Sequence, residues 1–186
     1  MDNLELQIET LCCLADSAFE MYEYERSINL LSEVIELAPN FSNAFSKRGI
    51  SYHFLDDYPN AIRDLSYAIE LNPSDWSALN FRGLTKVELN DFHSAIEDYT
   101  KAIELKPNIA SYYISRGELR VQSKDFENAL LDYDKVLELE QDNKIAYRER
   151  GLIKLKLKNK EGYCEDIKKT ISLDEENINK EQFKKN

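Results

Sequence analysis

The sequence predicts an all-α solenoid, in which five pairs of antiparallel helices stack into a single domain over residues 1–186. The main observation is that several residue types recur every 34 residues. A period of this size is typical of stacked helical repeats. The recurring residues are Gly49, Gly83, Gly117 and Gly151; Arg48, Arg82, Arg116 and Arg150; Asp64, Asp98, Asp132 and Asp166; Ala61, Ala95 and Ala129; and Pro39, Pro73 and Pro107.

Between these markers the apolar residues have helical spacing. In the segment that ends at Pro107 they recur at steps of three or four residues, as in Ala95, Tyr99 and Ala102. Proline cannot continue a helix, and it also disfavours the helical conformation in the residue before it. A polar turn halves each repeat, and its aspartate is well placed to cap the second helix. These aspartates are Asp57, Asp91 and Asp125.

The arginine and aspartate series occur together in four repeats, and both are missing from the first repeat, which has Leu14 and Leu30 instead. Pairing within a repeat uses every member, whereas pairing between successive repeats leaves Arg48 and Asp166 without partners. An antiparallel hairpin brings the two positions to about the same level. We therefore expect half-buried pairs within each repeat, namely Arg48 with Asp64, Arg82 with Asp98, Arg116 with Asp132, and Arg150 with Asp166.

The composition narrows the class of protein. The formal net charge of −11 argues against broad contact with nucleic acid, which requires clustered lysine and arginine. The acidic N-terminus does not resemble a signal peptide, and no apolar stretch is long enough to span a membrane. Three cysteines, two of them adjacent, make no disulfide framework, which favours a reducing, cytoplasmic location.

No group of residues in the sequence indicates catalysis. The two histidines, His53 and His93, fall at different positions of different repeats and do not suggest a catalytic pair. Cys12 and Cys13 are about 150 residues from Cys164, and no CxxC or HxxxH spacing points to zinc. The glycines are single and lie within helices, so they form no phosphate-binding loop. We expect a protein that is not an enzyme and needs no cofactor or metal.

The repeat resembles the tetratricopeptide repeat family. With Gly49 at position 8, position 4 holds Phe45, Leu79 and Tyr113, position 20 holds Ala61, Ala95 and Ala129, and position 32 holds Pro39, Pro73 and Pro107. The resemblance implies a right-handed superhelix of five repeats that binds proteins. The repeats are 8–41, 42–75, 76–109, 110–143 and 144–177, and residues 178–186 follow as a C-terminal cap or tail. The first and last repeats match the pattern less well.

In this family the first helices line a concave groove through positions 2, 5, 6, 9, 12 and 13. The resemblance therefore implies an adaptor or scaffold that holds a peptide or helix in that groove, or else a broader core there. The predicted groove is unlike the carboxylate clamp that binds chaperone tails, because positions 5 and 9 lack the Lys and Asn that the clamp requires. The expected groove residues are Asn43, Lys47, Ile50, His53, Phe54, Asn80, Phe81, Leu84, Glu88, Ile114, Ser115, Glu118, Arg148 and Leu152.

Self-assembly is the alternative function. The net charge is −8 over residues 1–41 and +4 over residues 144–186, so oppositely charged ends of two copies could associate. The basic end contains Lys154, Lys156, Lys158 and Lys160, which fan around a helix axis and also suit an ordinary solvated helix end. We further expect the tail to add a short helix that covers the last repeat with Ile178 and Phe183.

Overall fold

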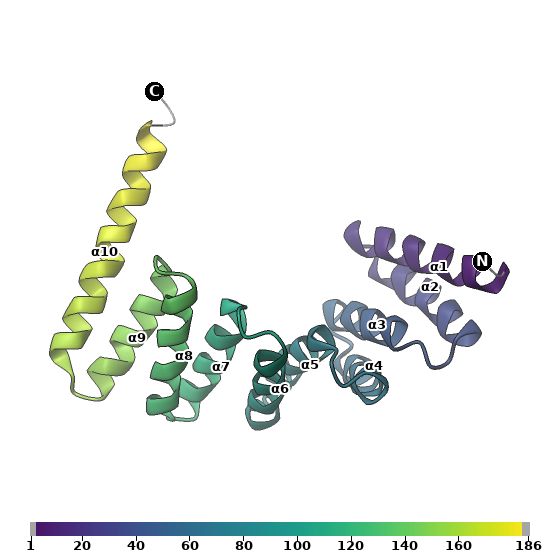
Figure 1. Cartoon of the computed structure of the whole chain (residues 1–186), viewed down its shortest axis with the longest axis horizontal. Helices are drawn as coiled ribbons and strands as arrows, with labels where there is room; N and C mark the ends of the chain where they lie inside the picture. Colours follow the sequence, from purple (N-terminus) through teal and green to yellow (C-terminus); the bar gives the residue numbers. More distant parts are fainter. Residues whose placement is uncertain (1–2, 184–186) are drawn as a thin grey trace. The chain divides into compact units, whose positions relative to one another are not determined.

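The computed structural model describes residues 3–183, with side chains through Asp174. Within this range the chain is all-helical, and consecutive helices form antiparallel pairs, as predicted (Figure 1). It divides into two compact units, residues 1–106 with α1 to α6 and residues 107–186 with α7 to α10. The helices are α1 (Asn3–Glu20), α2 (Tyr24–Leu37), α3 (Ser42–Phe54), α4 (Tyr58–Leu71), α5 (Trp76–Glu88), α6 (Phe92–Leu105), α7 (Ala110–Gln122), α8 (Phe126–Leu139), α9 (Lys144–Lys156) and α10 (Lys160–Phe183).

The turn inside each helix pair has the same backbone geometry. Its central residue, at position 15 of the repeat, has a left-handed backbone, and none of the five is glycine. In the second repeat this residue is Asp56 (φ 58°), and the N–H of Asp57 then donates to the carbonyl of Tyr52 at 3.0 Å. This bond satisfies a carbonyl that the end of the helix would otherwise leave free. The others are Tyr22, Asn90, Lys124 and Lys158.

The predicted caps are confirmed. Asp57, Asp91 and Asp125 each precede a second helix and accept a hydrogen bond from the backbone N–H three residues later. At the other end, the residue before proline leaves the helical region, as at Lys106 (φ −137°). These local signals set where each helix begins and ends.

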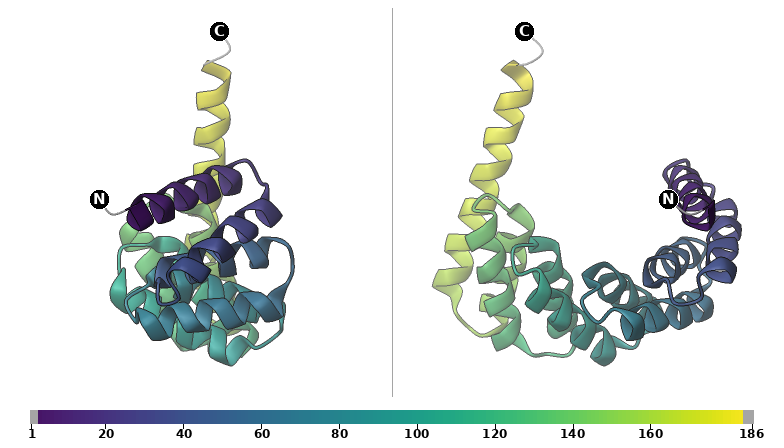
Figure 2. Two further views of the ribbon diagram at one scale, coloured as in Figure 1. Left: turned by 90° about the vertical axis from the view of Figure 1, so that its right-hand side faces the viewer. Right: turned by 45° about the vertical axis from the view of Figure 1, so that its right-hand side comes forward.

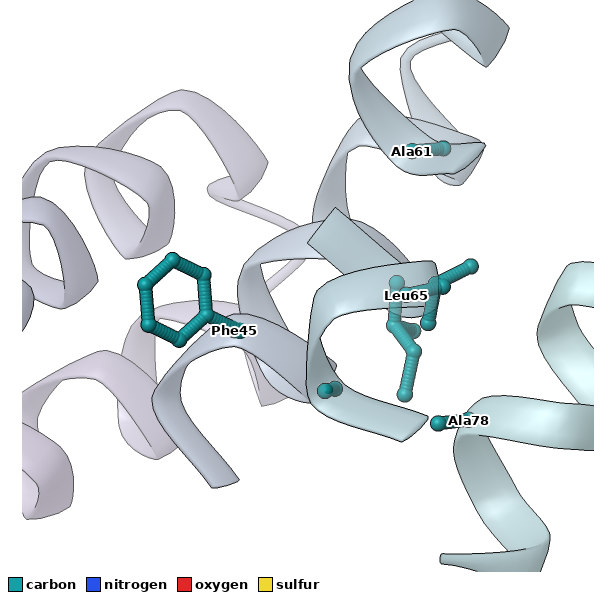
Figure 3. Packing of buried hydrophobic residues seen from close by; sticks show 6 residues of the cluster. Phe45, Ala61, Leu65 and Ala78 are labelled. Atoms are coloured by element: carbon teal, nitrogen blue, oxygen red, sulfur yellow. The ribbon is translucent and has the colours of Figure 1, made fainter. Parts of the chain in front are cut away.

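The core of the first compact unit lies between paired helices and between neighbouring pairs. Leu65 on α4 is fully buried, with Phe45 of α3 and Ala78 of α5 in the same cluster (Figure 3). Gly49 lets α3 and α4 approach closely, since a Cβ atom at this glycine would lie 2.7 Å from Cγ of Leu65. The recurring glycines are therefore packing positions, and a side chain there would overpack the helix pair.

All four predicted arginine–aspartate pairs are present. In each pair the aspartate is buried and the arginine side chain is at most 19% exposed. The two charged groups are 2.6 Å apart in every case. Two parallel N–H donors meet both carboxylate oxygens in the Arg82–Asp98 and Arg150–Asp166 pairs, the geometry that makes arginine–carboxylate contacts strong.

The arginines also join neighbouring repeats. Arg48 Nη1 donates to Ser32 Oγ at 3.0 Å, and Arg82 Nη1 donates to Ser66 Oγ at 3.1 Å. In the second compact unit, Arg150 makes the same contact with a carboxylate oxygen of the preceding repeat. Each of these arginines therefore bonds both to its own repeat and to the one before it.

The two ends of the chain differ from the expected frame. Helix α1 begins at Asn3, before the predicted start of the first repeat at residue 8. Helix α10 continues without a break to Phe183. Since it is antiparallel to α9 and much longer, it extends beyond the residue where α9 begins (Figure 2). The tail therefore prolongs α10 as far as residue 183 and does not form a separate short helix. The predicted covering contacts of Ile178 and Phe183 lie outside the side chains that the structure describes.

Candidate functional site

The first compact unit contains an apolar cavity of about 200 Å³ on the side formed by its first helices, α1, α3 and α5. Three of the predicted groove residues line it, namely Lys47, Ile50 and Phe81. The other lining residues, which the sequence reasoning missed, are Asp16, Phe19 and Ser27. The cavity therefore draws on the first three repeats, including the weakly matching first one.

Aromatic rings form a continuous cluster beside this cavity. Phe54 of α3 is the centre, because its ring contacts Phe19 at 5.6 Å and Phe81 at 5.9 Å between ring centroids. It also stacks on Tyr24 at the start of α2, with the two ring planes only 8° apart. Edge-to-face and offset ring pairs of this kind add stability beyond simple burial. The cluster gives the cavity a wall of well-supported aromatic side chains.

A charged pair marks the rim of the cavity. Lys47 Nζ of α3 donates to Asp16 Oδ2 of α1 at 2.7 Å, and both side chains remain partly exposed. The apolar floor of Ile50 and Phe81 thus lies next to one cation and one anion. A binding site of this kind combines apolar contact with a few polar groups that orient the ligand.

His53 supports the aromatic cluster from one side. Its ring lies 5.8 Å from that of Phe81, and its Nδ1 lies 3.0 Å from Thr85 Oγ1. The Thr85 hydroxyl donates to the carbonyl of Phe81, so its oxygen is left to accept a hydrogen bond from His53 Nδ1–H. Burial lowers the pKa of His53, while nearby Glu88 and Asp56 act against this shift. The histidine is thus a neutral packing residue near neutral pH.

The remaining predicted residues of the first compact unit lie apart from the cavity lining. His53 and Phe54 belong to the aromatic cluster, whereas Asn43 and Glu88 are exposed and do not line the cavity. Asn80 and Leu84 are half-buried on α5 and do not line it either. Position 2 of the repeat, which Asn43 occupies, points to solvent here.

In the second compact unit, the predicted residues are Ile114, Ser115 and Glu118 on α7, and Arg148 and Leu152 on α9. Arg148 pairs with its neighbour Glu149 at 2.9 Å. Partial burial raises the pKa of Glu118, and the nearby Glu149 carboxylate adds to this effect while Arg148 opposes it. Ile114 and Leu152 are apolar, whereas Glu118 and Arg148 carry opposite charges, so this surface is chemically mixed and differs from the apolar cavity of the first compact unit.

Replacing Glu118 with glutamine is expected to stabilise the protein at neutral pH. A raised pKa means that folding disfavours the carboxylate, so the wild type loses stability as the pH rises from the ordinary glutamate pKa through the raised value. The gain should therefore be present at about pH 7 and vanish at about pH 3, where the carboxyl is protonated in both states. Urea denaturation at the two pH values measures it. A glutamine variant that is less stable at neutral pH would contradict this account of the Glu118 environment.

Other kinds of functional site have little support in the described part of the chain. Among the side chains that the structure describes, through Asp174, no three His, Cys, Asp or Glu residues gather where they could hold a metal ion. No helix in the described range is long and apolar enough to cross a membrane. His93 is almost fully exposed beside Glu97, in a different repeat from His53. Cys12, Cys13 and Cys164 are all free thiols.

Two of the repeats match a known family model. Residues 77–109 and 110–143 each match the tetratricopeptide repeat family model. The chain contains tetratricopeptide repeats. The two matched segments coincide with the third and fourth repeats of the 34-residue frame, apart from one residue at the start of the third. Proteins with this fold are usually non-catalytic.

Solved structures of other tetratricopeptide repeat proteins share the fold. A crystal structure of MamA is 19% identical, with a TM-score of 0.83, and the match covers 89% of this chain and 96% of that one. A MamA structure from Desulfovibrio magneticus RS-1 is 15% identical, with a TM-score of 0.83 and coverage of 91% and 96%. YrrB, described as a TPR protein with an unusual peptide-binding site, is 19% identical, with a TM-score of 0.80 and coverage of 100% and 99%. No curated protein sequence matches the chain.

Proposed function

We propose that this protein is a non-enzymatic interaction module that holds a peptide or a helix of another protein against α1, α3 and α5 of the first compact unit. The observation that carries the proposal is the apolar cavity with its aromatic wall. An adaptor or scaffold role follows, because an open apolar cavity next to a few charged groups suits a peptide better than a reaction. The likeness of YrrB, whose description names a peptide-binding site, supports the same role.

The cavity indicates the chemistry of the bound segment. A volume of about 200 Å³ accommodates one or two large apolar side chains, and Phe19, Ile50 and Phe81 would contact them. An amphipathic helix presents such side chains on one face at three- or four-residue intervals. Lys47 and Asp16 at the rim would then orient polar groups of the segment. The unpaired thiols lead us to propose a reducing, cytoplasmic location as well.

Replacing Phe81 with glutamate is expected to abolish peptide binding without unfolding the protein. The carboxylate would enter the apolar cavity, where an unpaired charge is strongly disfavoured. A peptide selected from a random library against the wild type should bind the variant at least about 100-fold more weakly, roughly 2.7 kcal/mol of binding free energy. Isothermal titration calorimetry measures the difference.

The matched control replaces Leu89 with glutamate. Leu89 lies in the same compact unit, is 50% exposed and does not line the cavity. This variant should bind the selected peptide like the wild type, and circular dichroism should show that both variants remain folded. Equal affinity of the wild type and the Phe81 variant would show that the cavity is not the binding site.

A further inference from the structure

The repeats stack through a defined strip on each first helix. In the second repeat this strip comprises Ala44, Arg48 and Ser51 at positions 3, 7 and 10. Ala44 is 1% exposed and packs in the core of the preceding repeat, and Ser51 Oγ lies 3.4 Å from Ser27 Oγ of that repeat. Arg48 contacts the preceding repeat through its bond to Ser32. Positions 3, 7 and 10 of the second repeat are therefore the face that it presents to the first repeat.

Helix α1 presents the same strip, but no described residue covers it. The three positions hold Thr10, Leu14 and Ser17, and all three are exposed. Together with Leu6 they line a shallow groove on the outer side of α1, in which Leu6 is 51% and Leu14 is 44% exposed. An apolar groove of this kind is the half of a stacking interface that lacks its partner.

Helix α10 presents the opposite half of the same interface. On the second helices, positions 25 and 28 face the following repeat, as shown by Ser32, which bonds Arg48, and by Ile35, which packs against the core of the second repeat. On α10 these positions hold Lys168, which is exposed, and Ile171, which is 54% exposed. The last described repeat therefore ends in an uncovered apolar residue beside a cation.

The charges of the two faces complement one another. Inside the chain, an arginine at position 7 donates to a serine or aspartate at position 25 of the preceding repeat. At the ends both residue types change, since position 7 is Leu14 and position 25 is Lys168. If α1 of a second copy stacks on α10, it places no cation opposite Lys168. It brings the exposed acids Glu5 and Glu9 towards this end of the chain instead. The net charges of −8 over residues 1–41 and +4 over residues 144–186 also favour attraction between the two faces.

We propose that copies of this chain associate head to tail, with the α1 face of one copy stacked on the α10 face of the next. The two faces are different surfaces, so the contact is heterologous and leaves one free face at each end of the assembly. Its geometry repeats that of the contacts between neighbouring repeats within the chain. The proposal uses surfaces other than the cavity and does not depend on peptide binding.

The test is the association state of the full, untagged chain in analytical ultracentrifugation, from about 1 µM to about 1 mM. The weight-average mass should rise with concentration beyond that of a dimer, and it should rise less at about 0.5 M salt than at about 0.05 M, because salt screens the charged contact. A chain that stays monomeric over the whole range overturns the proposal.

Two variants test whether the contact is head to tail. Leu14→Arg places a cation opposite Lys168, and Ile171→Glu places an anion opposite the acidic α1, so each blocks one face. Each variant alone should self-associate at least about 10-fold more weakly than the wild type. An equimolar mixture should form a 1:1 dimer and nothing larger, because each variant retains one working face. A variant that alone dimerises as strongly as the wild type would indicate a symmetric contact and contradict the proposal.

The matched control is Leu131→Arg on α8, at a leucine that is 63% exposed and belongs to neither face. This variant should associate like the wild type. All three substitutions lie at exposed positions, so thermal melts should confirm that the variants are folded. Weakened association of the Leu131 variant to the same extent would show that the effect is general loss of apolar surface and would overturn the assigned faces.

Discussion

Replacing Asp98 with alanine is expected to lower the free energy of unfolding by about 3 to 5 kcal/mol. Asp98 is 1% exposed and lies between two cations, Arg82 Nη2 at 2.6 Å and Lys86 Nζ at 2.7 Å. Both cations are themselves less than one fifth exposed, so the variant would leave two half-buried charges without an anion. Urea denaturation followed by circular dichroism measures the loss.

An exposed pair provides the control for this prediction. Lys135 and Glu138 of α8 also form an ion pair at 2.7 Å, but their side chains are 39% and 66% exposed. Solvent screens such a pair, and Glu138→Ala should change stability by less than about 1 kcal/mol. Similar losses in the Asp98 and Glu138 variants would show that burial does not set the strength of the recurring pairs.

Replacing Leu65 with alanine is expected to cost about 2 to 5 kcal/mol, because the side chain is fully buried and its removal leaves a cavity between α3, α4 and α5. The cost should depend on Gly49. In the wild type, Gly49→Ala forces a Cβ atom to within 2.7 Å of Leu65 Cγ and should be destabilising. In the Leu65→Ala background the side-chain contact is gone and only the 3.1 Å contact with the backbone N of residue 65 remains, so the same change should cost clearly less.

A double-mutant cycle over Gly49→Ala and Leu65→Ala measures this coupling. We expect the cost of Gly49→Ala to fall markedly in the Leu65→Ala background, because the side-chain contact is removed and the backbone contact is kept. Additive effects would mean that Gly49 is not required for the close approach of α3 and α4, and that the recurring glycine has another role.

The repeat frame and the ion pairs could be predicted because they depend on local periodicity. Helical spacing, proline ends and aspartate caps set the helices, and the 34-residue period then places position 7 opposite position 23 of the same hairpin. The second cation of three of the four buried aspartates was missed, although the sequence contains its signal. Lys86, Arg120 and Lys154 are also 34 residues apart, and each contacts the aspartate of its repeat.

Burial alone would raise the pKa of Asp166, but hydrogen bonds from Arg150 and Lys154 outweigh it and lower the pKa. Asp166 therefore stabilises the fold above the ordinary aspartate pKa, and this contribution is lost as the pH falls below that value through the depressed one. The sign is opposite to that expected for Glu118. The difference in pKa direction arises because two bound cations outweigh burial at Asp166, whereas at Glu118 burial is the main cause and the neighbouring Glu149 carboxylate adds to it.

The candidate site could be predicted only in part. Of the groove residues predicted on the second and third repeats, Lys47, Ile50 and Phe81 line the cavity. The same positions of the weakly matching first repeat hold Asp16 and Phe19, which the sequence reasoning left out. The left-handed residue in each turn was also missed, because residues as different as Tyr22 and Lys124 occupy it and no glycine marks it.

The most direct test of the proposed interaction site is a set of intermolecular nuclear Overhauser effects between the protein and a library-selected peptide. The protein would carry labelled isoleucine methyl groups and phenylalanine rings. The account predicts contacts from apolar side chains of the peptide to Ile50, Phe19 and Phe81, the residues that line the cavity. Contacts confined to residues outside α1, α3 and α5, with none to these three, would contradict it.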